Sequence, residues 1–185
     1  MVGKFIRQAD RQTNKIRLGD IFNIFTGGDF IINKSTSGTI PLVSHQHKNN
    51  GVSKYVGNYG DRKIFNFNDT ISLADRGVFK ASTQNENFYI GTRVKALQFK
   101  DGNKSLEQRL FIVSQINKLQ VFFEDYSINA TDSLPNLKIE LPFNNKKLDF
   151  KFMEDFIRVI EKLVIKDVVL WAEKKIQATK KIINT

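Results

Sequence analysis

Hydrophobic and polar positions divide most of the chain into a region of short apolar runs and a region with a single helical pattern. From residue 30 to about residue 145, apolar runs are separated by Gly, Asn, Asp and Ser, which is typical of strands joined by polar loops. The predicted strands are 40–44, 63–65, 70–74, 88–90, 94–99 and 137–141. Apolar residues at helical spacing from Leu106 to Phe123 predict one helix that interrupts the series.

The first thirty residues carry weaker patterns. Residues 1–15 are polar and lack a period, so we interpret them as a lead-in segment. Apolar positions at helical spacing predict a short amphipathic helix over residues 17–25, and turn residues at 26–29 end it.

The last part of the chain predicts one long helix. No Gly or Pro occurs from Asp149, a candidate N-cap, to Ile183. Such a helix of about 35 residues is roughly 52 Å long and extends beyond the domain that precedes it. One apolar stripe, which we predict to be a partner-helix interface, consists of Phe152, Phe156, Val159, Leu163, Leu170 and Trp171. A second apolar face consists of Ile165, Val169, Ala172 and Ile176, and two faces predict more than one helical neighbour.

The long helix is not expected to form a regular coiled coil, because Lys166 and Glu173 interrupt its heptad pattern. Together these patterns predict an α/β (mixed α+β) domain with a short-stranded sheet, followed by one long C-terminal α-helix. We divide the chain into the lead-in segment 1–15, a globular domain 16–147 and the helix 148–185.

Composition narrows the classes of protein to which the chain can belong. It contains no cysteine, which excludes disulfides, zinc–thiolate sites and thiol nucleophiles. No signal region begins the chain, and no apolar stretch is long enough to cross a membrane. We therefore expect a soluble, cytoplasmic protein with no membrane partner.

The charge favours a polyanionic partner. The chain holds 29 basic and 19 acidic residues, a net charge of +10. Residues 31–100 hold ten basic and four acidic side chains, whereas residues 149–183 hold eight basic and six acidic ones. A basic middle and a nearly balanced tail predict that nucleic acid contacts the first part, although surface lysines also serve solubility alone.

Catalytic motifs are absent from the sequence. Gly27-Gly28-Asp29-Phe30 has the letters of the diguanylate cyclase loop but lacks its second acidic residue, so we interpret it as a turn. Glu173-Lys174-Lys175 is the nearest approach to a nuclease pattern, and it lies on the polar side of the predicted helix. No methyltransferase motif and no phosphate-binding loop occurs. We predict no catalytic residue, no metal site and no cofactor in this chain.

Two polar loops have the chemistry to read base edges. Asn and Gln pair with adenine, and Lys contacts guanine or phosphate. The candidate DNA-binding residues are Lys34, Ser44, His45, Gln46, His47, Lys48, Asn49, Asn50, Arg76, Lys80, Ser82, Gln84 and Asn85. Both loops, 44–50 and 75–85, follow predicted strands, so the sheet can present them side by side. Ordinary loop surface remains an alternative for both, and a metal site at His45 and His47 would lack further ligands.

Short motifs in a fixed order resemble the specificity (S) subunits of type I restriction–modification enzymes, and the related recognition domains of type II enzymes. The resemblance covers about residues 16–182. The motifs are Ile16-Arg17-Leu18-Gly19-Asp20-Ile21-Phe22 with Gly27-Gly28, Gly38-Thr39-Ile40-Pro41-Leu42-Val43-Ser44, Asn49-Asn50-Gly51-Val52, Asp69-Thr70-Ile71-Ser72-Leu73-Ala74 before Arg76-Gly77, Ile139-Glu140-Leu141-Pro142, and Leu148-Asp149-Phe150.

The resemblance implies a target-recognition domain that reads one part of a split site in double-stranded DNA. It also implies a helix that pairs with another and docks a DNA methyltransferase subunit. S-adenosylmethionine and Mg²⁺ are then expected in the methyltransferase and restriction subunits rather than here. Typical members have two recognition domains and two helices, so this chain is expected to be a half-subunit that dimerises through its C-terminal helix, or a fragment of a longer protein.

Two other functions are compatible with the residues. A free-standing RNA- or DNA-binding regulatory module would use Phe and Tyr for stacking on single strands. A small nuclease or nucleotide-processing enzyme would need turnover by the chain alone.

Overall fold

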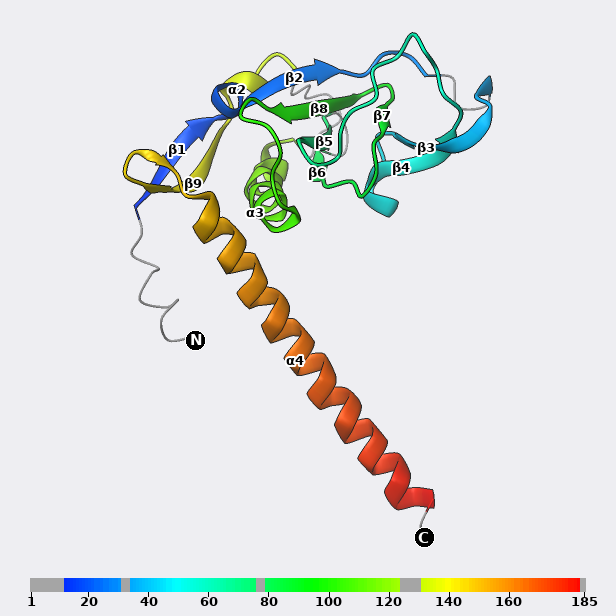
Figure 1. The fold of residues 1–185 in the computed structure, drawn as a ribbon, viewed down its shortest axis with the longest axis vertical. Coiled ribbons are helices and arrows are strands. Elements are labelled where there is room, and N and C mark those ends of the chain that lie inside the picture. The colour runs from blue at the N-terminus through cyan, green and yellow to red at the C-terminus, as the bar shows by residue number, and fades with distance from the viewer. Residues whose placement is uncertain (1–11, 31–33, 76–78, 124–130, 184–185) are drawn as a thin grey trace.

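The computed structural model describes residues 12–30, 34–75, 79–123 and 131–183. Figure 1 shows a globular part built from small sheets and helices, from which the C-terminal helix extends as a long rod. The predicted fold class, mixed α/β with short strands and a long C-terminal helix, is confirmed.

A four-stranded antiparallel sheet forms the centre of the globular part. Its strands in spatial order are β2 (Phe22–Thr26), β8 (Val94–Phe99), β5 (Thr70–Ala74) and β6 (Lys80–Ser82). All five residues of β5 and five of the six in β8 are buried, because both faces of these central strands are covered. The predictions at 70–74 and 94–99 are confirmed at their stated bounds.

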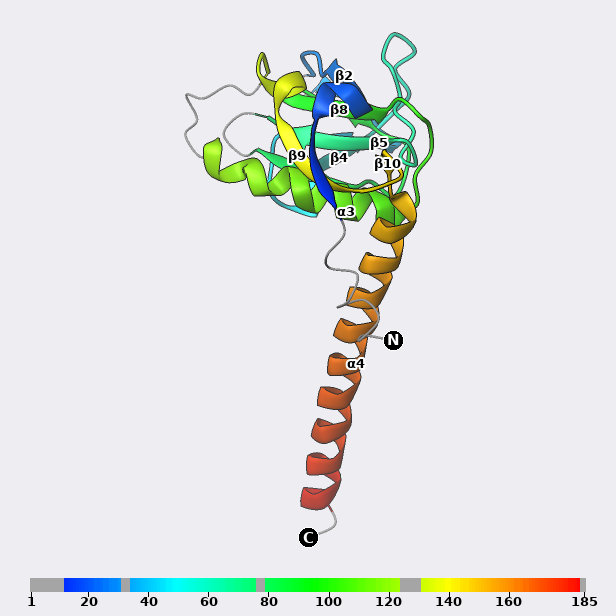
Figure 2. The same cartoon turned by 90° about the vertical axis from the view of Figure 1, so that its left-hand side faces the viewer.

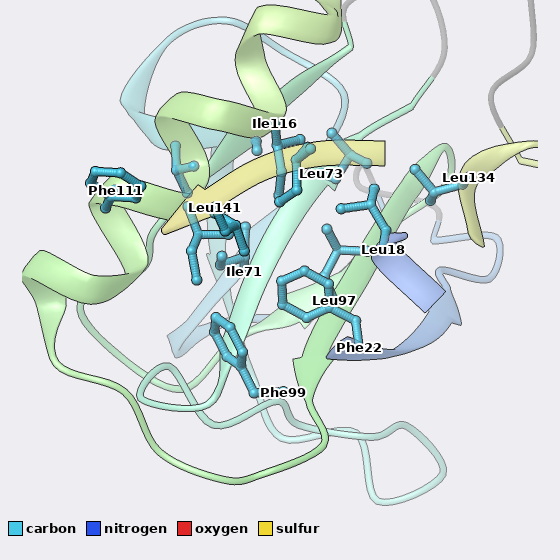
Figure 3. Packing of buried hydrophobic residues seen from close by; sticks show 14 of the residues in the cluster. Leu18, Phe22, Ile71, Leu73, Leu97, Phe99, Phe111, Ile116, Leu134 and Leu141 are labelled. Carbon is cyan, nitrogen blue, oxygen red and sulfur yellow. The ribbon is translucent and has the colours of Figure 1, made fainter. Parts of the chain in front are cut away.

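Helix α3 (Leu106–Asn117) packs on this sheet and completes the main hydrophobic core (Figure 3). Ser105 caps it: the Ser105 hydroxyl accepts from the backbone of Gln108, and the Gln108 side chain accepts from the backbone of Ser105. The predicted helix 106–123 is confirmed in its first part, and a 3-10 helix η3 (Lys118–Phe122) follows it.

A second antiparallel sheet contains β1 (Thr13–Arg17), β9 (Lys138–Asn144) and β10 (Lys147–Leu148), in the order β1-β9-β10. Strand β1 begins inside the segment that we interpreted as a lead-in. The short 3-10 helix η4 (Leu134–Asn136) precedes β9, which overlaps the predicted strand 137–141 and continues through Pro142.

The amphipathic helix predicted over residues 17–25 is wrong. Only α2 (Leu18–Ile21), a single turn, is helical there, and β2 follows it directly. Leu18 and Phe22 are buried as a helical face would be, but every residue of β2 pairs with a residue of β8. Because sheet pairing satisfies the backbone of these residues, tertiary structure overrides the local helical spacing.

The third sheet is irregular and carries the loop that leads to the candidate site. Its order is β4 (Val52–Val56), β3 (Ser37–Val43) and β7 (Tyr89–Ile90), with β3 and β4 antiparallel and β3 and β7 parallel. The strands predicted at 40–44 and 88–90 correspond to β3 and β7, whereas β4, β6 and β10 were not predicted. The strand predicted at 63–65 is wrong, since only Phe65 pairs there, with Phe88, in an isolated bridge.

Helix α4 (Phe150–Ile183) is 34 residues long and touches the globular part only at its start. Asp149 caps it, as predicted, by accepting a hydrogen bond from the Phe152 backbone at 2.9 Å. Met153 is fully buried, and Arg158 pairs with Glu107 of α3 at 3.1 Å. Figures 1 and 2 both show the rest of α4 projecting away from the sheets.

The surface of α4 beyond its first turns is exposed, including large apolar side chains. Leu163 is 43%, Leu170 45% and Trp171 62% exposed. None of the helices in the described ranges is both long and apolar enough to cross a membrane.

Candidate nucleic-acid interface

The loop between β3 and β4 is a compact, internally bonded turn. The Ser44 backbone donates to the Gly51 carbonyl at 2.8 Å, and the Gly51 backbone donates to the Lys48 carbonyl at 2.8 Å. Asn49, Asn50 and Gly51 have φ values of 49°, 50° and 87°, a left-handed conformation that asparagine and glycine tolerate better than other residues. The sequence Asn-Asn-Gly therefore determines how this loop turns.

Two hydrogen bonds join this loop to the segment after β5. The Gln84 side-chain amide donates to the Asn50 carbonyl at 2.8 Å and to the Ser72 hydroxyl at 3.0 Å. The Lys80 ammonium donates to the His47 carbonyl at 3.2 Å. The two loops that the sequence singled out thus lie side by side, as expected.

A hollow of about 270 Å³ lies between the two loops. Its polar lining comes from Asn49 and Asn50 on one side and from Gln84, Asn85 and Glu86 on the other. Its apolar lining is Pro41, Val52 and Tyr55, which belong to the β3–β4 hairpin. The sequence did not point to Tyr55 or Glu86 as site residues. Tyr55 was missed because β4 was not predicted, and Glu86 was missed because it lies one residue beyond the predicted loop.

The predicted DNA-binding residues fall into groups of different exposure. The exposed ones are Lys34, His45, His47, Lys48, Asn49, Asn50 and Asn85. Ser44, Gln46 and Lys80 are partly buried, and the Gln46 amide holds the loop by donating to the Val52 carbonyl at 2.6 Å. Lys34 precedes β3 and is not among the residues that line the hollow. Arg76 lies outside the described residues.

Ser82 and Gln84 require a correction. They are only 8% and 4% exposed, because Lys80–Ser82 forms strand β6 where we predicted a loop. The Ser82 carbonyl accepts from the Ser72 hydroxyl at 3.1 Å, which ties β6 to β5. Ser82 is therefore part of the sheet, and the Gln84 amide, although it lines the hollow, is engaged by Asn50 and Ser72.

Arg109 of α3 holds the second loop from beneath. Its guanidinium donates to the Gln84 carbonyl at 3.2 Å and to the Phe67 carbonyl at 2.6 Å, and it is 3% exposed. Burial lowers the pKa of Arg109 below its ordinary value, and Glu107 partly offsets this. Its Nε atom bonds no residue in the described ranges. The position of Gln84 is thus determined by the helix as well as by the loop.

A second, smaller hollow of about 170 Å³ lies beside the Gly27–Phe30 turn. Arg62 lies 4.6 Å from the ring centre of Phe30, and Lys63 lies 3.6 Å from that of Phe25. A Cβ atom at Gly27 would lie 2.0 Å from the Gly91 carbonyl oxygen, so the close approach of two backbones requires glycine there. The last contact explains Gly27 as a packing residue of the turn.

In the part of the chain that the structure describes, no three His, Asp or Glu side chains gather as a metal site needs. His45 and His47 are both exposed. The chemistry available at the joined loops is therefore hydrogen bonding by amides, imidazoles and one carboxylate, with lysines beside them.

Gln84 is expected to be the strongest single determinant of the loop arrangement. Replacing it by leucine leaves the Asn50 carbonyl and the Ser72 hydroxyl without their donor, and we expect a loss of about 1 to 3 kcal/mol in the free energy of unfolding. Urea denaturation measures this. Asn85→Ala, a change at the exposed neighbouring residue, is the matched control. Equal free energies of unfolding for the two variants would show that the Gln84 hydrogen bonds do not stabilise the loops.

Comparison with known proteins identifies similar sequences and folds. Residues 11–169 match the family model described as type I restriction modification DNA specificity domain. No curated protein matches the chain significantly.

Three solved structures of the type I system are similar in fold. The S subunit from M. genitalium has a TM-score of 0.62 and 17% identity, over 92% of this chain and 43% of that one. The HsdS subunit from Thermoanaerobacter tengcongensis has a TM-score of 0.60 and 16% identity, over 83% and 38%. A structure titled for complex assembly and conformational transition of the type I system has a TM-score of 0.62 and 19% identity, over 88% and 41%. The chain thus spans less than half the length of each of these chains.

Proposed function

The chain belongs to the family of type I restriction modification DNA specificity domains, and we propose that its two joined loops read one part of a split target in double-stranded DNA. The observation that carries this is the bonding of the loop after β3 to the segment after β5, through Gln84 and Lys80. A rigid pair of polar loops can enter the major groove with its side chains already placed.

The exposed residues of the loops suit two different tasks. Asn49, Asn50 and Asn85 offer amides for base edges, whereas Lys48 offers a charge for phosphate. His45 and His47 are exposed beside them and add further donors and acceptors. We assign no catalytic role to this chain, and place S-adenosylmethionine and Mg²⁺ in partner methyltransferase and restriction subunits.

The protruding part of α4 is proposed as the assembly surface. Leu163, Leu170 and Trp171 expose apolar area that a second copy or a methyltransferase subunit can cover. Phe152 and Phe156 instead pack against Phe111 of the chain's own α3, with ring centres 6.4 and 5.6 Å from it. The contribution of these two residues to a partner interface is therefore smaller than the sequence suggested.

A homodimer through α4 would impose symmetry on the target. Two identical domains related by a twofold axis read identical half-sites, so the expected target is an inverted repeat with a fixed spacer. The methylated motif in a host that carries this chain with its partner methyltransferase tests this directly, and an asymmetric split motif would contradict the homodimer.

Replacing Lys48 by alanine is expected to weaken duplex binding uniformly across sequences. A plot of the logarithm of the binding constant against the logarithm of the salt concentration has a negative slope. Removing one phosphate contact makes that slope shallower by about one. Titrations of duplex DNA at several salt concentrations measure this.

The matched control for Lys48 is Lys15→Ala on β1, which lies at the far end of the globular part from β3 and β4 (Figure 1). An unchanged slope in the Lys48 variant would remove that residue from the interface. Preference for single-stranded RNA over duplex DNA would contradict the proposed function itself.

A further inference from the structure

The hollow between the two loops has a composition that distinguishes one base pair from another. We propose that it reads an A·T base pair, with Glu86 and Asn85 contacting the adenine edge and Tyr55 contacting the thymine methyl group. This rests on the proposed function and specifies which base pair that same site selects.

The polar lining of the hollow combines one charged acceptor with amides that both donate and accept. Its lining contains one carboxylate, Glu86, and neither Lys nor Arg. Within the described parts of the chain, the side chains of Asn49, Asn85 and Glu86 bond no other residue, and all three are exposed. A carboxylate without a neighbouring cation disfavours phosphate, so the hollow suits the floor of a groove rather than the DNA backbone.

The Glu86 carboxylate distinguishes adenine from guanine by the atoms that each base presents in the major groove. In the major groove, adenine presents its N6 amino donor next to the N7 acceptor, and guanine presents two acceptors, O6 and N7. Glu86 can accept from the adenine amino group, and the Asn85 amide can donate to N7. Guanine in place of adenine would bring its O6 acceptor close to the carboxylate, which is repulsive. Cytosine in that place would offer its N4 amino group to Glu86 but no N7 acceptor to Asn85, so one of the two contacts would be lost.

The apolar side of the hollow matches the partner base. Pro41, Val52 and Tyr55 line it, and the Tyr55 side chain is 47% exposed. The C5 methyl of thymine is the apolar group that the four unmodified bases offer in the major groove. A lining with one carboxylate, free amides and an apolar part therefore fits an adenine paired with a thymine better than a G·C pair, because cytosine gives Asn85 no N7 acceptor and guanine gives Tyr55 no methyl group.

The hollow is also held in shape without a ligand. Gln84 bonds the Asn50 carbonyl, Arg109 bonds the Gln84 carbonyl, and Gln46 bonds the Val52 carbonyl. These three side chains connect both loops to the sheet and to α3. A site with little freedom to rearrange can reject a wrong base instead of adapting to it.

Substitution of single atoms on the DNA tests the assignment. The full chain is used to select its target from a randomised duplex library, and each A·T pair of the selected motif is then altered singly. Purine in place of adenine removes the amino group, and uracil in place of thymine removes the methyl group. Affinities are measured for the wild-type chain and for the Glu86→Ala and Tyr55→Ala variants, with Glu140→Ala on β9 as an exposed acidic control.

At one A·T position, purine is expected to weaken wild-type binding about 5- to 100-fold and to have little effect on Glu86→Ala. At the same position, uracil is expected to cost about fourfold in the wild type and little in Tyr55→Ala. The Glu140→Ala control should retain both losses.

Coupling of Glu86 to a G·C position would overturn the assignment, as would a selected motif in which no position couples to Glu86. Selection of no motif at all would overturn the proposed function and, with it, this inference. These failures are distinguishable, because only the last one removes sequence preference from the wild-type chain.

Discussion

Replacing Asp75 by alanine is expected to lower the free energy of unfolding by about 3 to 5 kcal/mol. The Asp75 and Lys95 side chains are 3% and 4% exposed, and their charged atoms are 3.2 Å apart. Asp75 also accepts a hydrogen bond from the Thr131 hydroxyl at 2.8 Å. Without the carboxylate, the Lys95 ammonium stays buried with no counter-charge at 3.2 Å, and it still donates to the Thr26 hydroxyl, 3.1 Å away. Urea denaturation followed by circular dichroism measures the loss.

An exposed ion pair provides the matched control. Arg17 and Asp20 are 2.8 Å apart but lie in solvent, so Arg17→Ala should leave the denaturation midpoint essentially unchanged. Replacing both buried partners, Asp75→Leu with Lys95→Met, should recover much of the stability lost by Asp75→Ala, because no uncompensated charge remains. If Asp75→Ala proved as stable as Arg17→Ala, the pair would not be buried in solution.

The same ion pair shows that a count of basic residues does not measure the charge on the surface. Lys95 counted toward the basic middle of the chain, yet it is buried and neutralised by Asp75. Exposed lysines such as Lys48 still support a polyanionic partner. Sequence composition does not distinguish the two, because burial depends on which strands pair, and β5 and β8 bring residues 75 and 95 together from separate segments.

Strands were predictable where apolar residues are dense between polar loops, as in β5, with Ile71, Leu73 and Ala74, and in β8. Strand β4 was not, because two polar residues, Ser53 and Lys54, interrupt its few apolar ones and only Val56 is buried. The apolar spacing at 17–25 predicted a helix wrongly, because a single helical turn followed by a strand can bury the same positions. These errors concern segments whose conformation is determined by distant partners.

The candidate site was predictable in position but not in detail. Polar residues after β3 indicated the first loop, and the structure joins it to the second. The burial of Gln84 and the support from Arg109 depend on contacts between residues far apart in sequence, for which no local pattern exists. Likewise, the apolar stripe of α4 was recognised, but periodicity alone did not show that α3 covers Phe152.

Introducing glutamate at both Leu163 and Leu170 is expected to abolish pairing of α4 with its partner while leaving the globular part folded. Both side chains are large, apolar and nearly half exposed on α4, so they contribute to its exposed apolar surface. Burying each leucine stabilises an interface by about 1.5 to 3 kcal/mol, so the dissociation constant should rise at least about 100-fold. Analytical ultracentrifugation measures self-association, and co-purification measures retention of the methyltransferase subunit.

The polar side of the same helix offers a control of equal charge. Lys151→Gln with Lys162→Gln changes the net charge by the same amount as the two glutamates, but on a face of α4 that is roughly a quarter turn or more around the helix axis from Leu163 and Leu170. Association should persist in this variant, because its apolar stripe is intact. Equal weakening in both variants would assign assembly to net charge rather than to apolar packing. Unchanged association in the glutamate variant would show that α4 is not the assembly surface, and the two joined loops would then read their half-site without it.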